Sequence, residues 1–205
     1  HVRSRRQRQM CIRDSSKSRL QTAGLLPAEF GWFPENITAD LDAVIVGMHA
    51  KEDNPELIKA RELGLTIHSF PSYVYEQSQN KQRIVIAGSH GKTSVTSMIL
   101  HVLKTCNQDF DYVVGAGIDG FDTMVKLSDA PYIIIEGDEY LSASFDRTPK
   151  FMRYQHHILV LNGIAWDHVN VFPTFDGYVK LFKDLTDSTP TVSYTHLRAH
   201  ETRHD

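Results

Sequence analysis

The sequence has few cysteines and no long apolar segment. Its 205 residues include two cysteines, Cys11 and Cys106, which are too few for a disulfide framework or a cysteine-rich metal cluster. No apolar run approaches the roughly 18 residues that a membrane-spanning helix requires. With 41% hydrophobic and 23% charged residues, the composition predicts a soluble protein of one or two domains without a membrane partner.

The two ends of the chain lack the periodicity of a folded segment. Residues 1–16 contain five arginines and one acid, and residues 193–205 are equally patternless. We expect both to be non-native flanks that take no part in the fold. A basic arm for nucleic acid or a targeting peptide is the alternative for the first. Three histidines in the second resemble a metal-binding tract, but no other ligand is near. We expect no nucleic acid partner.

Between the ends, strand-like runs alternate with helix-like ones, which predicts an α/β fold with a mainly parallel sheet. Ligands in such sheets bind at the carboxyl ends of the strands. A polar stretch, 78–82, is the predicted linker between two parts. The predicted strands are 42–47, 65–68, 83–87, 112–114, 132–136 and 158–161, and the predicted helices are 55–63, 72–79, 92–105 and 174–185.

Two helices have clear local patterns. The first begins at Pro55 and has Asn54 as its expected N-cap, with Gly64 just past its end. The helix predicted over 92–105 carries apolar residues at helical spacing, so we expect one buried face. The residues of that face are Val95, Met98, Ile99, Val102 and Leu103.

The predicted strand 83–87 leads directly into a glycine-bracketed loop and a helix. Small residues let backbone N–H groups approach an anion, a lysine adds a positive charge, and a threonine hydroxyl can reach Mg²⁺. The pattern predicts a nucleoside triphosphate site, and an ordinary strand-to-helix turn is the alternative. Ile86 stands where the general phosphate loop has glycine, so the loop is a shortened form. Its residues are Gly88, Ser89, His90, Gly91, Lys92, Thr93 and Ser94.

Acidic residues follow the predicted strand 132–136, in the order Glu136-Gly137-Asp138-Glu139. Carboxylates beside a phosphate loop suit Mg²⁺, which prefers oxygen ligands. Glu136, the residue nearest the strand end, is the first candidate ligand. A solvated acidic turn is the alternative.

The segment after the last predicted strand contains Asn162, Asp167 and His168. His168 is a candidate for a second metal or for a place near the transferred phosphate, with Asp167 orienting its ring. A purely structural histidine is the alternative. His156 and His157 precede the strand, away from the loops, and we assign them no role.

These three motifs, in this order, resemble those of the Mur ligase family of ATP-dependent amide-forming enzymes, in which the shortened loop is usual. The resemblance covers about residues 20–190 and implies that ATP and Mg²⁺ are the cofactors. It implies catalytic roles for Lys92 and His168, and metal ligands Thr93, Glu136 and His168. It also implies nucleotide contacts from the loop Gly88 to Ser94 and from Asn162.

The resemblance also implies a domain plan. Residues 17–80 resemble part of an N-terminal Rossmann-like domain that binds a UDP-sugar, and residues 81–190 resemble part of the central ATP-binding domain, a P-loop ATPase core. A third domain is missing by this measure. We therefore expect an inactive fragment of a cytoplasmic bacterial enzyme whose oligomeric state is unknown.

Within the family, the motifs are most similar to the branch that joins UDP-N-acetylmuramate to the L-Ala-γ-D-Glu-meso-diaminopimelate peptide in peptidoglycan recycling, through an acyl phosphate. In that branch the acidic motif usually continues with Tyr-Asp, whereas here Leu141 follows Tyr140. The branch that adds L-alanine is the first alternative. A folate-type polyglutamate ligase shares the ATPase plan, although residues 20–80 argue against it. A P-loop ATPase or GTPase switch is more distant, because no guanine-reading Asn-Lys-x-Asp stretch occurs.

Overall fold

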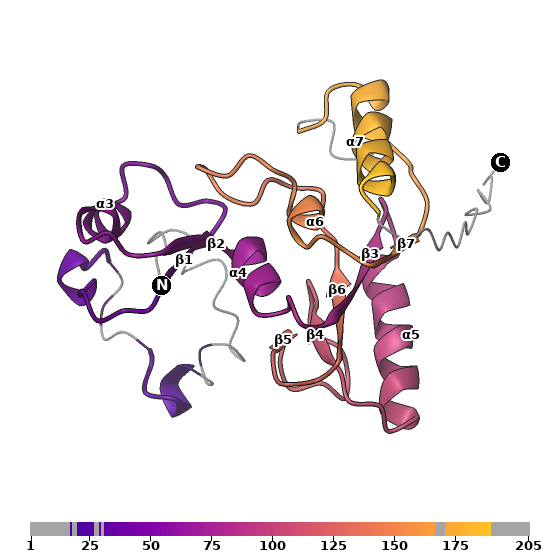
Figure 1. Cartoon of the computed structure of the whole chain (residues 1–205), viewed down its shortest axis with the longest axis horizontal. Helices are drawn as coiled ribbons and strands as arrows, with labels where there is room; N and C mark the ends of the chain where they lie inside the picture. The colour runs from indigo at the N-terminus through magenta and orange to yellow at the C-terminus, as the bar shows by residue number, and fades with distance from the viewer. Residues whose placement is uncertain (1–16, 18–19, 27–28, 30, 167–170, 190–205) are drawn as a thin grey trace. The chain divides into compact units, whose positions relative to one another are not determined.

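The structure, a computed structural model, describes residues 17, 20–26, 29, 31–166 and 171–189 (Figure 1). The flank 1–16 and Asp167 and His168 lie outside the described residues, as does 193–205. The chain divides into two compact units. The first contains the residues up to Tyr73 together with Leu141–Thr148, and the second contains Val74–Tyr140 and the residues from Pro149 onward. None of the helices in the described ranges has the length and apolar character needed to cross a bilayer.

The first unit has a two-stranded parallel sheet. Its buried core includes Val44, Val46 and Leu57. The predicted N-cap is confirmed, because Asn54 Oδ1 accepts hydrogen bonds from the backbone N–H groups of Glu56 and Leu57 at 3.0 and 3.1 Å. The elements are η1 (Pro34–Asn36), β1 (Val44–Val46), α3 (Pro55–Glu62) and β2 (Ile67–Ser69).

The segment Leu141–Thr148 belongs to the first unit although it lies inside the second in sequence. Ser69 Oγ lies 3.1 Å from Asp146 Oδ2, and Ser144 Oγ donates to the Ala50 carbonyl. No periodicity or motif predicted that this segment belongs to the first unit, because its place depends on side-chain hydrogen bonds between residues more than 70 positions apart.

The second unit has a five-stranded sheet in the order β5-β4-β6-β3-β7. Every neighbouring pair is parallel except β4 with β5. This confirms the predicted α/β fold with a mainly parallel sheet. The two-residue edge strand β5 was not predicted, because it is too short to show an alternating pattern. The strands are β3 (Gln82–Ala87), β4 (Asp111–Val113), β5 (Val125–Lys126), β6 (Tyr132–Glu136) and β7 (Ile158–Leu161).

Helices cover both faces of this sheet (Figure 1). Ile86 and Ile134 share a buried cluster with Leu100 of α5 (Lys92–Thr105). On the other face, Phe151 of α6 (Lys150–Arg153) packs on Phe182 of α7 (Phe175–Asp187), with ring centroids 5.5 Å apart. A further helix, α4 (Phe70–Glu76), contains the boundary between the two units.

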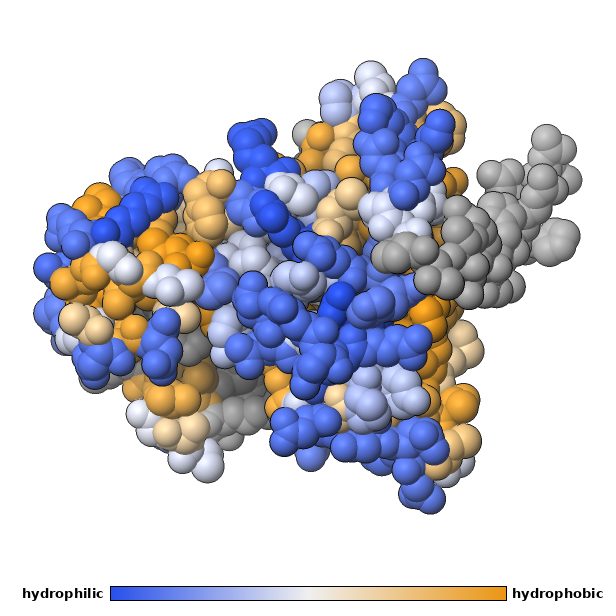
Figure 2. Space-filling view, viewed as in Figure 1, coloured by the Kyte–Doolittle hydropathy of each residue, from blue (hydrophilic) through white to orange (hydrophobic). Residues whose placement is uncertain are grey.

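The buried face of α5 differs from the predicted one. Met98 and Val102 are 60% and 57% exposed, and Figure 2 shows hydrophobic surface on the side of the second unit where α5 lies. Val95, Ile99 and Leu103 of the predicted face do pack against the buried core. Thr96 and Leu100, which lie outside that face, are fully buried. Hydrophobic spacing therefore predicted the helix and three residues of its packed face correctly, and Met98 and Val102 wrongly.

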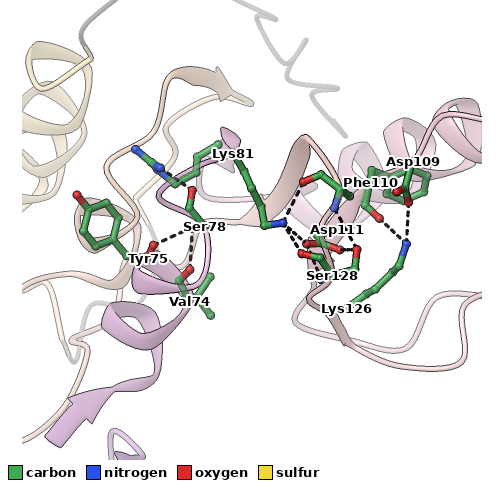
Figure 3. Close-up of polar contacts among 11 residues, drawn as sticks. Val74, Tyr75, Ser78, Lys81, Asp109, Phe110, Asp111, Lys126 and Ser128 are labelled. Atoms are coloured by element: carbon green, nitrogen blue, oxygen red, sulfur yellow. Dashed lines mark hydrogen bonds and ion pairs between the residues drawn. The ribbon is translucent and has the colours of Figure 1, made fainter. Parts of the chain in front are cut away.

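The predicted linker at 78–82 is not a linker. Ser78 and Lys81 are buried, and Gln82 already belongs to β3. The Lys81 ammonium lies 3.1 Å from the Asp111 carboxylate, and both side chains are at most 2% exposed (Figure 3). Lys81 also donates to the carbonyls of Ser128 and Ala130. Lys81 thus belongs to a buried ion pair, whereas Gln79, Asn80 and Gln82 are exposed.

His156 is buried at the start of β7. Its side chain is 2% exposed, and Nε2 lies 2.6 Å from Thr189 Oγ1. Burial, with smaller contributions from the charges of His157 and Arg83, lowers the pKa of His156 to about 4. The imidazole is therefore neutral in the folded protein at neutral pH.

This gives a pH dependence of stability. The folded pKa of His156 is lower than the unfolded value of 6.5, so the unfolded state binds more protons between these values, and stability falls as the pH drops from about 6.5 to about 4. We expect His156 to contribute a loss of about 2 kcal/mol. Urea unfolding at pH 7.5 and 4.5 measures it. His156→Gln should show a shallower loss than the wild type, and His101→Gln, at an exposed position, should not. Equal slopes for His156→Gln and the wild type would contradict the assignment.

Candidate functional site

The loop between β3 and α5 requires two glycines. Gly88 and Gly91 have φ angles of 131° and 74°, which side chains disfavour. A Cβ atom on Gly91 would lie 2.6 Å from Asn162 Nδ2, and one on Gly88 would lie 2.9 Å from the Gly163 carbonyl oxygen. The loop is therefore packed closely against the chain segment that follows β7.

The start of α5 can receive an anion. No side chain caps this helix, whose N-cap residue is Gly91. The N–H groups in the first turn of a helix have no intrahelical acceptor, and the helix dipole adds positive potential there. His90 and Ser94 are exposed beside this turn. The geometry matches the predicted phosphate loop.

Lys92 lies across the loop. Its ammonium donates to the Gly88 carbonyl at 2.7 Å and to Glu139 Oε2 at 3.2 Å. The Glu139 side chain is 1% exposed and that of Lys92 is 15% exposed. The sequence motif contained Glu139 but did not predict this ion pair, because it depends on how the chain turns after β6.

Thr93 and Glu136 meet at the carboxyl ends of β3 and β6. Thr93 Oγ1 donates to Glu136 Oε1 at 2.7 Å, and the backbone N–H of Gly115 donates to Glu136 Oε2 at 2.9 Å. A hydroxyl and a carboxylate oxygen side by side are suitable ligands for Mg²⁺, which takes few protein ligands and completes its shell with water and phosphate. Among the described residues, no group of three or more His, Cys, Asp or Glu side chains could hold a metal.

The three carboxylates of the acidic motif have different partners. Asp138 pairs with Lys150 at 2.7 Å and accepts a hydrogen bond from the Tyr140 N–H. Glu136 contacts Thr93 and Glu139 contacts Lys92, as described above. Gly137 lies between Glu136 and Asp138 in sequence. A Cβ atom at this position would lie 2.6 Å from Val85 Cγ1, so a side chain does not fit there. Two of the three carboxylates therefore contact side chains of the phosphate-loop motif.

Hydrogen bonds of Asn162 and Ser89 join the loop to the segment after β7 and to α7. Asn162 Nδ2 donates to the His90 carbonyl at 2.9 Å. Ser89 is buried, and its N–H donates to the Gly163 carbonyl at 3.1 Å. Its Oγ accepts from the Ala165 N–H at 2.9 Å and lies 3.0 Å from the Tyr178 hydroxyl. Ser89, predicted as a nucleotide contact, thus has protein partners for both its N–H and its hydroxyl.

Tyr178 is the residue at this site that sequence analysis missed. It is one of the buried residues of α7, a helix that the sequence predicted over 174–185. Its hydroxyl contact with the loop could not be read from a helical pattern. Asp167 and His168 lie outside the described residues, so the roles predicted for His168 stay predictions.

A family model described as the Mur ligase middle domain matches residues 86–200. The chain is 31% identical over 150 residues to the UDP-N-acetylmuramate–L-alanyl-gamma-D-glutamyl-meso-2,6-diaminoheptandioate ligase of Haemophilus influenzae, covering 73% of this chain and 33% of that protein. It is also 31% identical over 156 residues to the UDP-N-acetylmuramate–L-alanine ligase of Carboxydothermus hydrogenoformans, covering 75% and 32%. The chain thus spans about a third of the length of these curated relatives.

A solved structure is similar over most of the fold. The crystal structure of the UDP-N-acetylmuramate:L-alanyl-gamma-D-glutamyl-meso-diaminopimelate ligase from Neisseria meningitides superposes with a TM-score of 0.75 at 26% identity, covering 85% of this chain and 57% of that one. The family model spans more than half of the chain. The chain belongs to the Mur ligase family.

Proposed function

We propose that the chain contributes the ATP site of a ligase that forms a carbon–nitrogen bond on a cell-wall precursor. The observation that carries the proposal is a pair of contacts at the carboxyl ends of β3 and β6, Thr93 with Glu136 and Lys92 with Glu139. The open first turn of α5 completes this set of groups. The Lys92 ammonium and the first turn of α5 suit the negative phosphates of a nucleoside triphosphate, and the oxygens of Thr93 and Glu136 suit its divalent cation.

In this proposal the ATP phosphates lie against the loop Gly88 to Gly91 and the first turn of α5. Lys92 exchanges its contacts with Gly88 and Glu139 for phosphate oxygens. Thr93 and Glu136 hold Mg²⁺, and His168 is proposed as a further metal ligand. The cation lowers the charge repulsion between the phosphates and an approaching carboxylate.

The reaction proposed joins a carboxylate to an amine. The carboxylate of UDP-N-acetylmuramate attacks the γ-phosphorus, an oxygen–phosphorus bond forms, and ADP departs with the bridging oxygen. The amine then attacks the carbonyl carbon of the acyl phosphate, the carbon–oxygen bond breaks, phosphate leaves, and the nitrogen loses a proton. Such transfer depends on alignment and charge neutralisation, which the loop and Lys92 supply.

For the amine we propose the tripeptide L-Ala-γ-D-Glu-meso-diaminopimelate. The relatives from Haemophilus influenzae and Neisseria meningitides, named for that substrate, support it. L-alanine is the second candidate, because a ligase named for it has the same 31% identity.

We also propose that residues 17–80 contain most of this chain's share of the domain that binds the UDP-sugar, and that residues 81–190 contain most of its share of the ATP-binding domain. The two compact units differ slightly from this division, because they separate after Tyr73 and place Leu141–Thr148 with the first unit. The parallel strands β1 and β2 of the first unit suit a Rossmann-like sheet. Activity is proposed for the whole enzyme, since the curated relatives are about three times as long as the matched region.

Phosphate release tests the function. In a full-length enzyme that contains this chain, we expect release from ATP when UDP-N-acetylmuramate and the tripeptide are both present, and little when either is omitted. Replacing the tripeptide by L-alanine decides between the two amines. Steady ATP or GTP hydrolysis without either substrate would instead indicate a nucleotide-driven switch and would contradict the proposal.

A further inference from the structure

We propose that the hydroxyl of Tyr178 is a positioning group for the phosphate loop and acts through Ser89. The inference rests on the proposed function, since it concerns the loop that would bind ATP. Tyr178 belongs to α7, which follows the loop by more than 80 residues in sequence. It is therefore a long-range support that no local motif reveals.

The first argument is the set of contacts around Ser89. Its hydroxyl oxygen lies 3.0 Å from the Tyr178 hydroxyl and accepts from the Ala165 N–H at 2.9 Å. Its own N–H donates to the Gly163 carbonyl. Ser89 is thus held by α7 on one side and by the segment after β7 on the other. Because Ser89 sits between the two glycines of the loop, these contacts limit where the loop backbone can lie.

The second argument is the rigidity of Tyr178. The residue is fully buried. Its ring packs on Phe172 and Phe182, each with a centroid 5.1 Å away, and Phe182 packs on Phe151 of α6. A buried tyrosine ring with two aromatic neighbours places its hydroxyl accurately. The aromatic packing therefore fixes the point to which Ser89 is bound.

The third argument is that the loop needs such support. Two of its residues are glycines with positive φ, which gain much conformational freedom when contacts are lost. Asn162 restrains the loop at the His90 carbonyl and Lys92 at the Gly88 carbonyl, and Ser89 supplies a further restraint. A phosphate loop stabilises charge well only when its N–H groups are already in place. Loss of one restraint should weaken nucleotide binding without unfolding the protein.

Tyr178→Phe tests this, because it removes the hydroxyl and keeps the ring. We expect the amides of residues 88–93 to exchange with solvent about threefold to tenfold faster in the nucleotide-free protein, measured by mass spectrometry. We expect the Kd for ATP with Mg²⁺, measured by calorimetry, to rise about fivefold, the usual effect of one neutral hydrogen bond.

Tyr112→Phe is the matched control. Tyr112 is also buried, and its hydroxyl lies 3.1 Å from the hydroxyl of Thr123, away from the loop. Both variants should lose similar thermal stability, but Tyr112→Phe should leave loop exchange and ATP affinity unchanged. The double variant Ser89→Ala/Tyr178→Phe should bind ATP no more weakly than Ser89→Ala, because the two groups act as one unit.

Two outcomes would overturn the inference. One is that Tyr178→Phe changes loop exchange and ATP affinity no more than Tyr112→Phe does. The other is that the effects of Ser89→Ala and Tyr178→Phe on affinity add. If the wild type binds no ATP while Tyr178→Phe still accelerates loop exchange, the proposed function fails and the support of the loop by Tyr178 stands.

Discussion

Lys92→Ala is expected to weaken ATP binding by about a hundredfold or more and to abolish ligase turnover. The ammonium is the cation of the phosphate-loop motif, and it already lies within hydrogen-bond distance of the loop carbonyl of Gly88. A hydrogen bond to a charged group contributes about 1.5 to 3 kcal/mol, or roughly 10- to 150-fold in affinity, and removing one preorganised donor typically costs a factor of about 10² to 10³ in turnover. Calorimetric titration with ATP and Mg²⁺, and phosphate release in the full-length enzyme, measure the two effects.

This substitution also leaves the buried carboxylate of Glu139 without its Lys92 partner, so part of any loss could reflect stability. Lys92→Ala/Glu139→Gln removes that charge and should recover stability without recovering ATP binding. Lys150→Ala is a matched control, because it breaks the ion pair with Asp138 in the same acidic motif and should leave affinity within about twofold. ATP affinity close to that of the wild type in Lys92→Ala would contradict the loop assignment.

Lys81→Met is expected to destabilise the protein by about 3 to 5 kcal/mol, the usual cost of leaving one partner of a buried ion pair unpaired. Asp111 is fully buried and lies 3.1 Å from Lys81. Asp111 keeps its hydrogen bonds from the N–H and hydroxyl of Ser128, but no other ion pair with it is recorded in the part of the chain that the structure describes. Urea unfolding at pH 7.5 measures the loss.

A second lysine in the same region provides the control (Figure 3). Lys126 pairs with Asp109 at 3.2 Å, and these side chains are 43% and 69% exposed. Lys126→Met should therefore cost less than about 1 kcal/mol. Lys81→Met/Asp111→Asn should lose less stability than Lys81→Met, since the unpaired charge is gone. A loss for Lys81→Met no larger than that for Lys126→Met would show that the buried pair contributes little.

Much of the fold follows from local pattern. The strands of the parallel sheet and the helices α3, α5 and α7 were predicted because apolar runs, an N-cap asparagine and helical spacing are local properties. The buried face of α5 was predicted only in part. Val95, Ile99 and Leu103 pack on the core, whereas Met98 and Val102 match the apolar spacing but are exposed, and Thr96 and Leu100 are buried. Which apolar face is buried is decided by the packing partner, and a single helix does not contain that information.

In the candidate site, too, local features were predicted and contacts set by tertiary packing were not. The sequence predicted that the phosphate loop and Glu136 would lie at the same edge of the sheet, because both follow strand ends, and the contact between Thr93 and Glu136 agrees with this. The ion pair of Lys92 with Glu139 and the contact of Ser89 with Tyr178 were not predicted. Both join residues more than 40 positions apart, so they depend on tertiary packing. The polar stretch around Lys81 was misread for the same reason.

Thr93 and Glu136 are proposed to hold the divalent cation of a bound nucleotide. A crystal structure with a non-hydrolysable ATP analogue and Mn²⁺ in place of Mg²⁺ tests it most directly, because manganese gives an anomalous signal. We predict an anomalous peak about 2.1 Å from Thr93 Oγ1 and from a Glu136 carboxylate oxygen, with the β- and γ-phosphates against the loop. A nucleotide bound elsewhere, or a peak away from both residues, would contradict the claim.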